Sequence, residues 1–354
     1  MPSRLAAASA SIESAMKHGG DLFQATSTYG GAEEDWLDLS TGINPHAYPV
    51  PASLPASAWS RLPAHAAQES LLKAARAAYQ VPAHLGLAAA PGTQVILPHL
   101  PALLPEGGVT IAGPTYSSHG DAWRAAGRQV SETSDIFRAG PEDRIALIVS
   151  PNNPDGRWHE PQALLKLAGD MQQRGGFLVV DEAFADVDPS RSLLPHLMDE
   201  PVLVLRSFGK FFGLAGLRLG FLAGPRNVTD ALARRLESWS VSGPALKVGT
   251  QALRDLDWQA AMRKKLAQEM ASLEDVLRAA GLAIRGGTSL YVLAEHPGAA
   301  RLHQALAQRR IWVRAFDYAP SWLRFGLPGS PEGLARLRQA LTEAMASHDE
   351  ATPC

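Results

Sequence analysis

The stretch Ser207-Phe-Gly-Lys-Phe-Phe-Gly-Leu-Ala-Gly-Leu-Arg-Leu-Gly220 places one lysine, Lys210, among glycine and phenylalanine residues. It follows Val202–Arg206, a short and mostly apolar run that predicts a buried strand. Most lysines lie in solvent at the surface, but the neighbouring phenylalanine side chains argue against a simple exposed loop. Lys210 is therefore a candidate nucleophile that could bind a carbonyl compound covalently.

Similar apolar runs occur upstream, and segments of helical length separate them. We predict strands at Val109–Ala112, Ile145–Ser150 and Phe177–Val180, with helices such as Pro161–Arg174 between them. Buried parallel strands that alternate with helices form a doubly wound α/β sheet. The sequence therefore predicts an α/β fold in which a large domain contains a mostly parallel sheet.

The two ends of the chain differ from this central region. Residues 1–60 are rich in Ala, Ser, Gly and Pro, so we expect an N-terminal arm or small-domain segment there. Residues 61–244 would form the large domain, and residues 245–354 a smaller α+β domain with strands at Ser289–Ala294 and Trp322–Leu327. Further helices are expected at Glu69–Tyr79, Val95–Leu104, Ala260–Ala280, Arg301–Arg309 and Pro331–His348.

The composition is that of an ordinary globular protein: 46% of the 354 residues are hydrophobic, 19% are charged, and the formal net charge is −2. This balance indicates neither a nucleic-acid partner nor a membrane surface. The only cysteine, Cys354, is the last residue, so no internal disulfide can form, which agrees with a reducing compartment. We expect a cytoplasmic protein without a secretory signal, a membrane span or a metal site.

Polar motifs occur where the predicted strands end. They are Ser150-Pro-Asn-Asn-Pro-Asp-Gly156, Asp181-Glu-Ala-Phe184 and the segment around Lys210, while the turn Pro91-Gly-Thr-Gln94 could open a helix. In an open parallel sheet, functional groups gather in the loops beyond the carboxyl ends of the strands. We therefore expect these motifs to contribute to one site.

These groups match the needs of the cofactor pyridoxal 5′-phosphate (PLP). Lys210 offers the amine that binds the cofactor covalently, and Asp181 offers a carboxylate that keeps the ring nitrogen protonated, so that the ring acts as an electron sink. Asn153 could donate to the ring hydroxyl, and Tyr116 could stack on the ring. The groups expected to hold the phosphate are Gly92, Thr93, Ser207 and Arg218, and Gln94 is a further residue expected to bind the cofactor.

Each residue also has a purely structural interpretation. Asp181 could cap a helix, Asn153 lies in a stretch that favours turns in any protein, and Tyr116 could be ordinary core. Arg218 could pair with any surface carboxylate, although its spacing from Lys210 favours phosphate. Since all the motifs occur together, the cofactor interpretation is preferred. No Gly-x-Gly-x-x-Gly motif follows the first strand, which argues against a nucleotide-binding oxidoreductase.

Taken in order, the motifs resemble those of the class I/II aminotransferases, PLP-dependent enzymes of the aspartate-aminotransferase fold. The stretch from Ser207 to Gly220 is similar to the family's PLP-lysine signature, and Asn153-Pro-Asp-Gly156 is similar to its Asn-Pro-x-Gly. Asp181-Glu-Ala-Phe184 is similar to its Asp-x-x-Tyr. The resemblance covers residues 90–327 and implies Lys210 and Asp181 as catalytic residues and a homodimer with the site at the interface.

Within the fold, several features resemble the threonine-phosphate decarboxylases of cobalamin biosynthesis. They are His18-Gly-Gly-Asp21, the run Leu37-Asp-Leu-Ser-Thr-Gly-Ile-Asn-Pro45, the segment from Arg206 to Gly216, and Phe184 in place of the common tyrosine. The resemblance implies decarboxylation of L-threonine O-3-phosphate to (R)-1-amino-2-propanol O-2-phosphate. Histidinol-phosphate aminotransferases share almost every cofactor motif, so transamination of histidinol phosphate or a similar amino acid remains the alternative.

A phosphorylated amino acid carries a carboxylate and a phosphate, so its pocket should be cationic. Arg324, in Leu323-Arg-Phe-Gly326, is similar to the family's carboxylate-binding arginine, and Arg314 could meet a second anionic group. The other residues expected to bind substrate are His18, Gly19, Asn44 and Asn153.

One position departs from the family pattern. Related enzymes commonly have a Tyr-Pro pair where Arg61-Leu-Pro63 lies, and that tyrosine reaches the cofactor phosphate of the partner subunit. Leu62 cannot make this contact. Either another residue takes the place of the tyrosine, or this part of the chain corresponds to the family pattern with a shift of a few positions.

Overall fold

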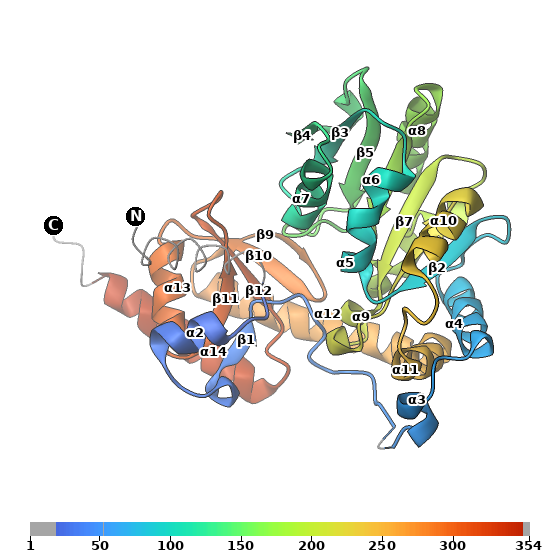
Figure 1. Cartoon of the computed structure of the whole chain (residues 1–354). Coiled ribbons are helices and arrows are strands. Elements are labelled where there is room, and N and C mark those ends of the chain that lie inside the picture. The colour runs from blue at the N-terminus through green and yellow to red at the C-terminus, as the bar shows by residue number, and fades with distance from the viewer. Residues whose placement is uncertain (1–18, 52, 350–354) are drawn as a thin grey trace, which may run out of the picture. The chain divides into compact units, whose positions relative to one another are not determined.

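The computed structural model describes residues 19–51 and 53–349. The chain divides into two compact units, each described by itself (Figure 1). The larger unit is His46–Leu266, and the smaller unit combines the chain up to Pro45 with the chain from Ala267. Residues 46–60 and 245–266, which the sequence analysis assigned to the arm and the C-terminal domain, belong to the larger unit.

The larger unit is built on a seven-stranded sheet with the order β2-β8-β7-β6-β5-β3-β4. All strands run in one direction except β8, which pairs antiparallel with both β2 and β7. This confirms the predicted mostly parallel sheet. The strands are β2 (Gly86–Ala90), β3 (Gly108–Ala112), β4 (Val130–Thr133), β5 (Asp143–Val149), β6 (Phe177–Asp181), β7 (Val202–Ser207) and β8 (Gly220–Gly224).

Helices cover this sheet because alternate strand residues present apolar side chains to the same face. One face packs against α5, α6, α7 and α10 through side chains such as Leu147, Leu205 and Trp123, whereas α8 contacts β5 and β6. The helices are α3 (Ala56–Ser60), α4 (His65–Ala78), α5 (Thr93–Ile96), α6 (Leu100–Leu103), α7 (Ser117–Ala125), α8 (Pro161–Gln173), α9 (Phe208–Phe211), α10 (Arg226–Leu236), α11 (Gly243–Arg254) and α12 (Leu256–Ala279), the last of which contributes residues to both units.

Two details explain differences from the predicted elements. The helix expected at Val95–Leu104 is divided into α5, a 3-10 turn (Leu97–His99) and α6, because Pro98 and Pro101 cannot donate a backbone hydrogen bond. The end of the expected arm forms α3, which packs against α11, and α11 in turn packs along α4. These contacts are why the larger unit extends beyond the predicted limits of 61 and 244.

The smaller unit contains a five-stranded sheet with the order β1-β11-β12-β10-β9. β1, from the N-terminal segment, pairs in parallel with β11, so the beginning of the chain supplies an edge strand. The expected strand Ser289–Ala294 begins only at Tyr291, since the two preceding residues form the turn from β9. The elements are α2 (Phe23–Tyr29), β1 (Leu37–Leu39), β9 (Ala283–Thr288), β10 (Tyr291–Glu295), α13 (Ala299–Gln308), β11 (Ile311–Ala315), β12 (Trp322–Gly326) and α14 (Pro331–Asp349).

Candidate active site

The predicted cofactor residues lie along one side of the seven-stranded sheet, where the parallel strands have their carboxyl ends. The carboxyl ends of β2, β3, β5, β6 and β7 lie at this edge because these strands are parallel, and β8 begins there because it runs the opposite way. The residues placed along it are Gly92, Thr93 and Gln94 after β2, Tyr116 after β3, Asn153 after β5, Asp181 at the end of β6, Ser207 and Lys210 at and after the end of β7, and Arg218 before β8.

Asp181 is a buried carboxylate that is fixed at both oxygens. Its side chain is 5% exposed. Oδ2 accepts a hydrogen bond of 2.8 Å from Nε2 of His119, and Oδ1 accepts one of 2.9 Å from the backbone N–H of Ala183. An ionised carboxylate can only accept, so His119 carries its proton on Nε2. This geometry gives the carboxylate one orientation at the end of β6.

His119 was not singled out by the sequence analysis. It lies on α7, three residues after Tyr116, and the two rings meet edge to face with centroids 5.9 Å apart. The i, i+3 spacing at the start of a helix places both side chains on one face, which is the signal that could have found it. Its Nδ1 is buried and has no hydrogen-bond partner among the described residues.

Arg218 lies against the turn that carries Gly92. Gly92 has φ +89°, and a Cβ added to it would be 2.7 Å from Nη2 of Arg218. A Cβ on Gly220 would come within 2.5 Å of the backbone nitrogen of Thr93, so the two segments approach backbone to backbone. Nη1 of Arg218 donates to the carbonyl of Ala215 at 3.1 Å. An arginine beside the first N–H groups of a helical segment suits an anion.

Tyr116 connects two of the loops at this end of the sheet. Its hydroxyl donates to Oε1 of Gln94 at 3.0 Å, which joins the loops after β2 and β3. Burial raises the pKa of Tyr116; the charge of Asp181 raises it further, and that of Arg218 lowers it. Both charged groups therefore act on the phenol.

Lys210 is half-buried on α9 and lies against an aromatic ring. Its Nζ is 5.6 Å from the ring centroid of Phe184, which is 4% exposed. The rings of Phe208 and Phe212 stack 4.3 Å apart, and Trp258 stacks on Phe212 at 5.7 Å. α9 is therefore part of an aromatic cluster. This confirms the prediction that Lys210 does not lie in a simple exposed loop.

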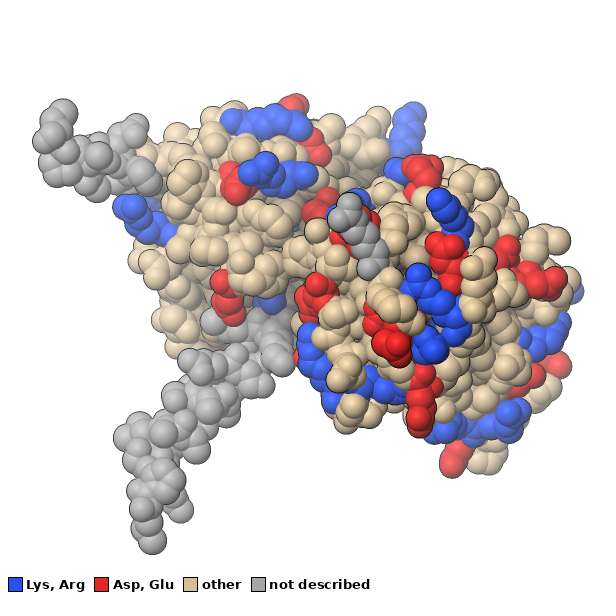
Figure 2. Space-filling model, turned by 90° about the horizontal axis from the view of Figure 1, so that it is seen from above, with Lys and Arg blue, Asp and Glu red and all other residues tan. Residues whose placement is uncertain are grey.

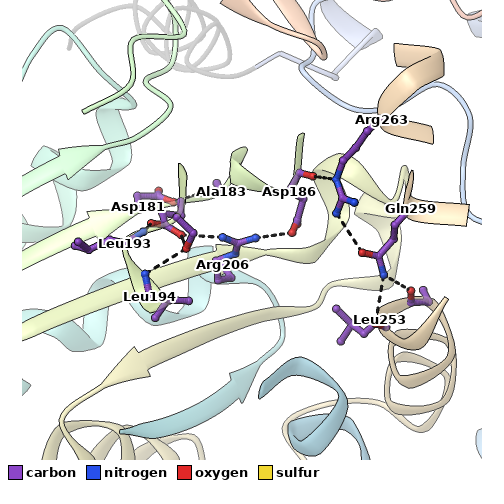
Figure 3. Close-up of polar contacts among 12 residues, drawn as sticks. Asp181, Ala183, Asp186, Leu193, Leu194, Arg206, Leu253, Gln259 and Arg263 are labelled. Atoms are coloured by element: carbon purple, nitrogen blue, oxygen red, sulfur yellow. Dashed lines mark hydrogen bonds and ion pairs between the residues drawn. The ribbon is translucent and has the colours of Figure 1, made fainter. Parts of the chain in front are cut away.

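A buried ionic network lies beside the site (Figure 3). Arg206, at 1% exposure, donates to Oε2 of Glu182 at 2.8 Å and to Oδ1 of Asp186 at 2.5 Å. Arg263 donates to the carbonyl of Asp186 at 2.7 Å and to Gln259 at 3.2 Å. Burial lowers the pKa of the Arg206 guanidinium, but the carboxylates of Asp186 and Glu182 raise it above the ordinary arginine value. Arg206 therefore remains charged in the interior.

Arg324 and Arg314 face each other in the smaller unit. They are paired residues on β12 and β11, so their guanidinium groups project from neighbouring strands. Arg324 is 6% exposed, donates to the carbonyl of Ser40 at 2.7 Å, and lies 5.2 Å from the ring centroid of Tyr291. The pKa of Arg324 is lowered to about 10, mainly by burial and in smaller part by the charge of Arg314. Two neighbouring cations favour an anionic ligand.

The N-terminal segment of the smaller unit lies beside this pair. The backbone N–H of Gly20 donates to Oγ of Ser40 at 2.9 Å, and a Cβ on Gly19 would collide with the Ser40 carbonyl. Gly19 therefore adjoins the residue that orients Arg324. Asn44 is 2% exposed in the loop after β1. His18, the remaining candidate, lies outside the described residues.

Within residues 19–51 and 53–349, no helix is long and apolar enough to cross a membrane, and no group of three or more His, Cys, Asp or Glu side chains could hold a metal ion. Figure 2 shows positive and negative side chains interspersed on one face of the molecule.

Comparison with known proteins gives a consistent result. Residues 65–341 match the family model described as aminotransferase class I and II. The chain is 44% identical to a threonine-phosphate decarboxylase of Sinorhizobium sp over 92% of its length and 97% of the relative's. It is 42% identical, over the same shares, to a threonine-phosphate decarboxylase of Pseudomonas aeruginosa.

A solved structure agrees with the fold. The structure of histidinol-phosphate aminotransferase from Sinorhizobium meliloti, in complex with pyridoxal-5′-phosphate, has a TM-score of 0.78 and 19% identity, and the match covers 93% of this chain and 95% of that one. The resemblance inferred from the motifs is thereby confirmed. The chain belongs to the class I and II aminotransferase family.

Proposed function

We propose that this protein binds PLP at the carboxyl edge of the seven-stranded sheet. The residues present fit the group. The buried Asp181 carboxylate, fixed by His119, suits a protonated ring nitrogen, and Lys210 offers an amine for the aldehyde. Arg218 against Gly92 suits the phosphate, with Ser207 as a further hydroxyl donor. When bound, PLP supplies an electron sink for a bond broken at the substrate α-carbon.

The reaction we propose is the decarboxylation of L-threonine O-3-phosphate to (R)-1-amino-2-propanol O-2-phosphate. The bond between the α-carbon and the carboxylate breaks, CO2 leaves, and a proton takes its place on the α-carbon. The observation that carries this proposal is the 44% and 42% identity, over 92% of the chain, to two relatives named threonine-phosphate decarboxylase.

The arginine pair of the smaller unit suits the two anionic groups of this substrate. We propose that Arg324 binds the carboxylate and that Arg314 meets the phosphate, assisted by Gly19, Asn44 and the loop residue Asn153. The bond that breaks is the one held perpendicular to the cofactor ring, so orientation of the carboxylate selects the reaction. In this proposal, the hydrogen bond from Arg324 to the Ser40 carbonyl helps to orient the guanidinium, and with it a carboxylate bound there.

The reaction can be tested with purified protein, PLP and L-threonine O-3-phosphate, without any keto acid. We expect release of one CO2 for each phosphorylated amino alcohol formed, measured by trapped CO2 and by mass spectrometry. A parallel reaction would contain histidinol phosphate and a keto-acid acceptor. Turnover that requires the acceptor, with no CO2 released, would show that the protein is an aminotransferase.

Replacing Arg324 with alanine should weaken substrate binding much more than cofactor binding. Truncating one partner of a buried charge pair costs on the order of 2–5 kcal/mol, so KM should rise by about 30-fold or more. The affinity for PLP, measured by titrating its visible absorbance, should stay within about twofold. Arg301→Ala, at an exposed position of α13 in the same unit, is the matched control and should change neither quantity. Equal loss of both affinities would place Arg324 elsewhere than in the substrate site.

We also propose a homodimer. Trp59, Leu62 and Trp239 are 71%, 68% and 58% exposed, and α3, which carries Trp59, packs against the beginning of α11 next to the Trp239 loop. Leu62 occupies the position at which the resemblance places a residue that reaches the partner subunit. Sedimentation should give twice the 37.8 kDa mass of one chain, and Trp59→Glu should produce monomers. A monomeric unmodified protein would contradict the proposal.

A further inference from the structure

The turn that follows β6 is held at both ends by one guanidinium group. Arg206 bonds Glu182 through Nη1 at 2.8 Å and Asp186 through Nη2 at 2.5 Å. We call these three side chains the Arg206 bridge. Phe184 lies midway between the two carboxylates in sequence, two residues from each. The ring that contacts Nζ of Lys210 is therefore carried by a turn that the Arg206 bridge closes.

Both carboxylates of the bridge have further anchors. Glu182 accepts hydrogen bonds from Oγ of Ser192 at 2.6 Å and from the backbone N–H of Leu193 at 2.7 Å. The carbonyl of Asp186 accepts one from Arg263 (Figure 3). Arg206, Glu182 and Asp186 are at most 5% exposed, so water cannot replace a lost partner. Buried ions that lose a partner are strongly destabilised, which leaves the turn few other conformations.

We propose that Arg206 is a positioning residue for Lys210. It acts through Phe184: by fixing the turn of residues 182–186, it holds the aromatic ring against the ε-amino group. A ring face stabilises an ammonium group by its quadrupole, so loss of this contact should let the Lys210 amine give up its proton more readily. The inference rests on the proposed role of Lys210 and adds a residue that touches neither cofactor nor substrate. A merely structural arginine would affect stability and leave the amine unchanged.

The proton affinity of Lys210 can be measured on the full chain after PLP has been removed by dialysis against hydroxylamine and then against buffer. Labelling by acetic anhydride at a series of pH values, quantified on the Lys210 peptide by mass spectrometry, gives the midpoint of its titration. In Arg206→Lys, which keeps the positive charge but lacks the fork that bonds both carboxylates, the midpoint should fall by about half a pH unit, because the ring no longer stabilises the ammonium form. Phe184→Leu should give the same shift, and the double variant should show no further change.

Arg128→Lys is the matched control. Arg128, in the same unit, donates to the carbonyls of Pro101, Leu104 and Pro105, so its replacement should lower the melting temperature and leave the Lys210 midpoint unchanged. If Arg206→Lys does not fold, Asp186→Glu changes the length of the bridge at constant charge and should give a smaller shift in the same direction.

Two outcomes would overturn the proposal. The first is an unchanged midpoint in folded Arg206→Lys or, should that variant fail to fold, in Asp186→Glu. The second is a shift that persists undiminished in the Phe184→Leu background. The labelling requires neither cofactor nor substrate, so a wrong functional assignment would be detected separately, as the absence of visible absorbance when PLP is added to the unmodified protein.

Discussion

Lys210→Ala should abolish covalent attachment of PLP, its visible absorbance and turnover. Removing a residue that forms a covalent bond during catalysis can cost on the order of 10⁴–10⁶-fold in kcat. The side chain of Lys210 is half-buried on α9, and its amine lies 5.6 Å from the Phe184 ring centroid. We therefore expect no lysine from the flexible surface to take over its role. Absorbance spectra and CO2 release, measured on the same preparation, test both parts.

The control for Lys210 is a lysine of the same unit that lies in solvent. Lys247, on α11, is exposed, and Lys247→Ala should retain the full absorbance and rate. Borohydride reduction of the PLP-loaded protein, followed by peptide mass spectrometry, identifies the modified lysine. If the label is found at any position other than 210, or if Lys210→Ala keeps its absorbance, the assignment is wrong. Thermal unfolding of each variant separates loss of the amine from loss of the fold.

The fold could be predicted where strands are continuously apolar. β5 and β7 are buried along most of their length and appear in the sequence as short runs of Ile, Leu and Val, and both were predicted within two residues. β2 consists of glycine, leucine and alanine, and β4 is Val-Ser-Glu-Thr, so neither has a run or alternation of large apolar residues. These strands form because the neighbouring strands already present unpaired backbone groups.

The site could be predicted where a residue's position follows from the strand that precedes it. Asp181 and Lys210 come directly after apolar runs, and the parallel order of the strands then places them at one edge. His119 and Arg206 could not be assigned in this way, because their roles depend on contacts with residues 62 and 24 positions away. The pairing of Arg314 with Arg324 likewise depends on the register of β11 against β12, which the sequence alone does not specify.

Asp181→Ala should separate cofactor binding from catalysis. The groups that we propose to bind the phosphate, at Gly92 and Arg218, and the amine of Lys210 are untouched by this change, so PLP should remain attached, as measured by its absorbance. The ring nitrogen would lose its carboxylate, and a carboxylate fixed by His119 and Ala183 cannot be replaced by water without reorganisation. Removing one such electrostatic group costs about 10²–10³-fold in kcat, with KM changed much less.

Asp143→Ala is the corresponding control, because Asp143 begins β5 at the opposite edge of the same sheet and bonds Thr110 and the backbone of Gly140. It should lower the melting temperature and leave kcat unchanged. A fall of PLP content in parallel with kcat in Asp181→Ala would mean that the carboxylate holds the cofactor in place. An unchanged kcat would mean that the ring nitrogen faces another group, since an electron sink without its counter-charge cannot stabilise the developing carbanion equally well.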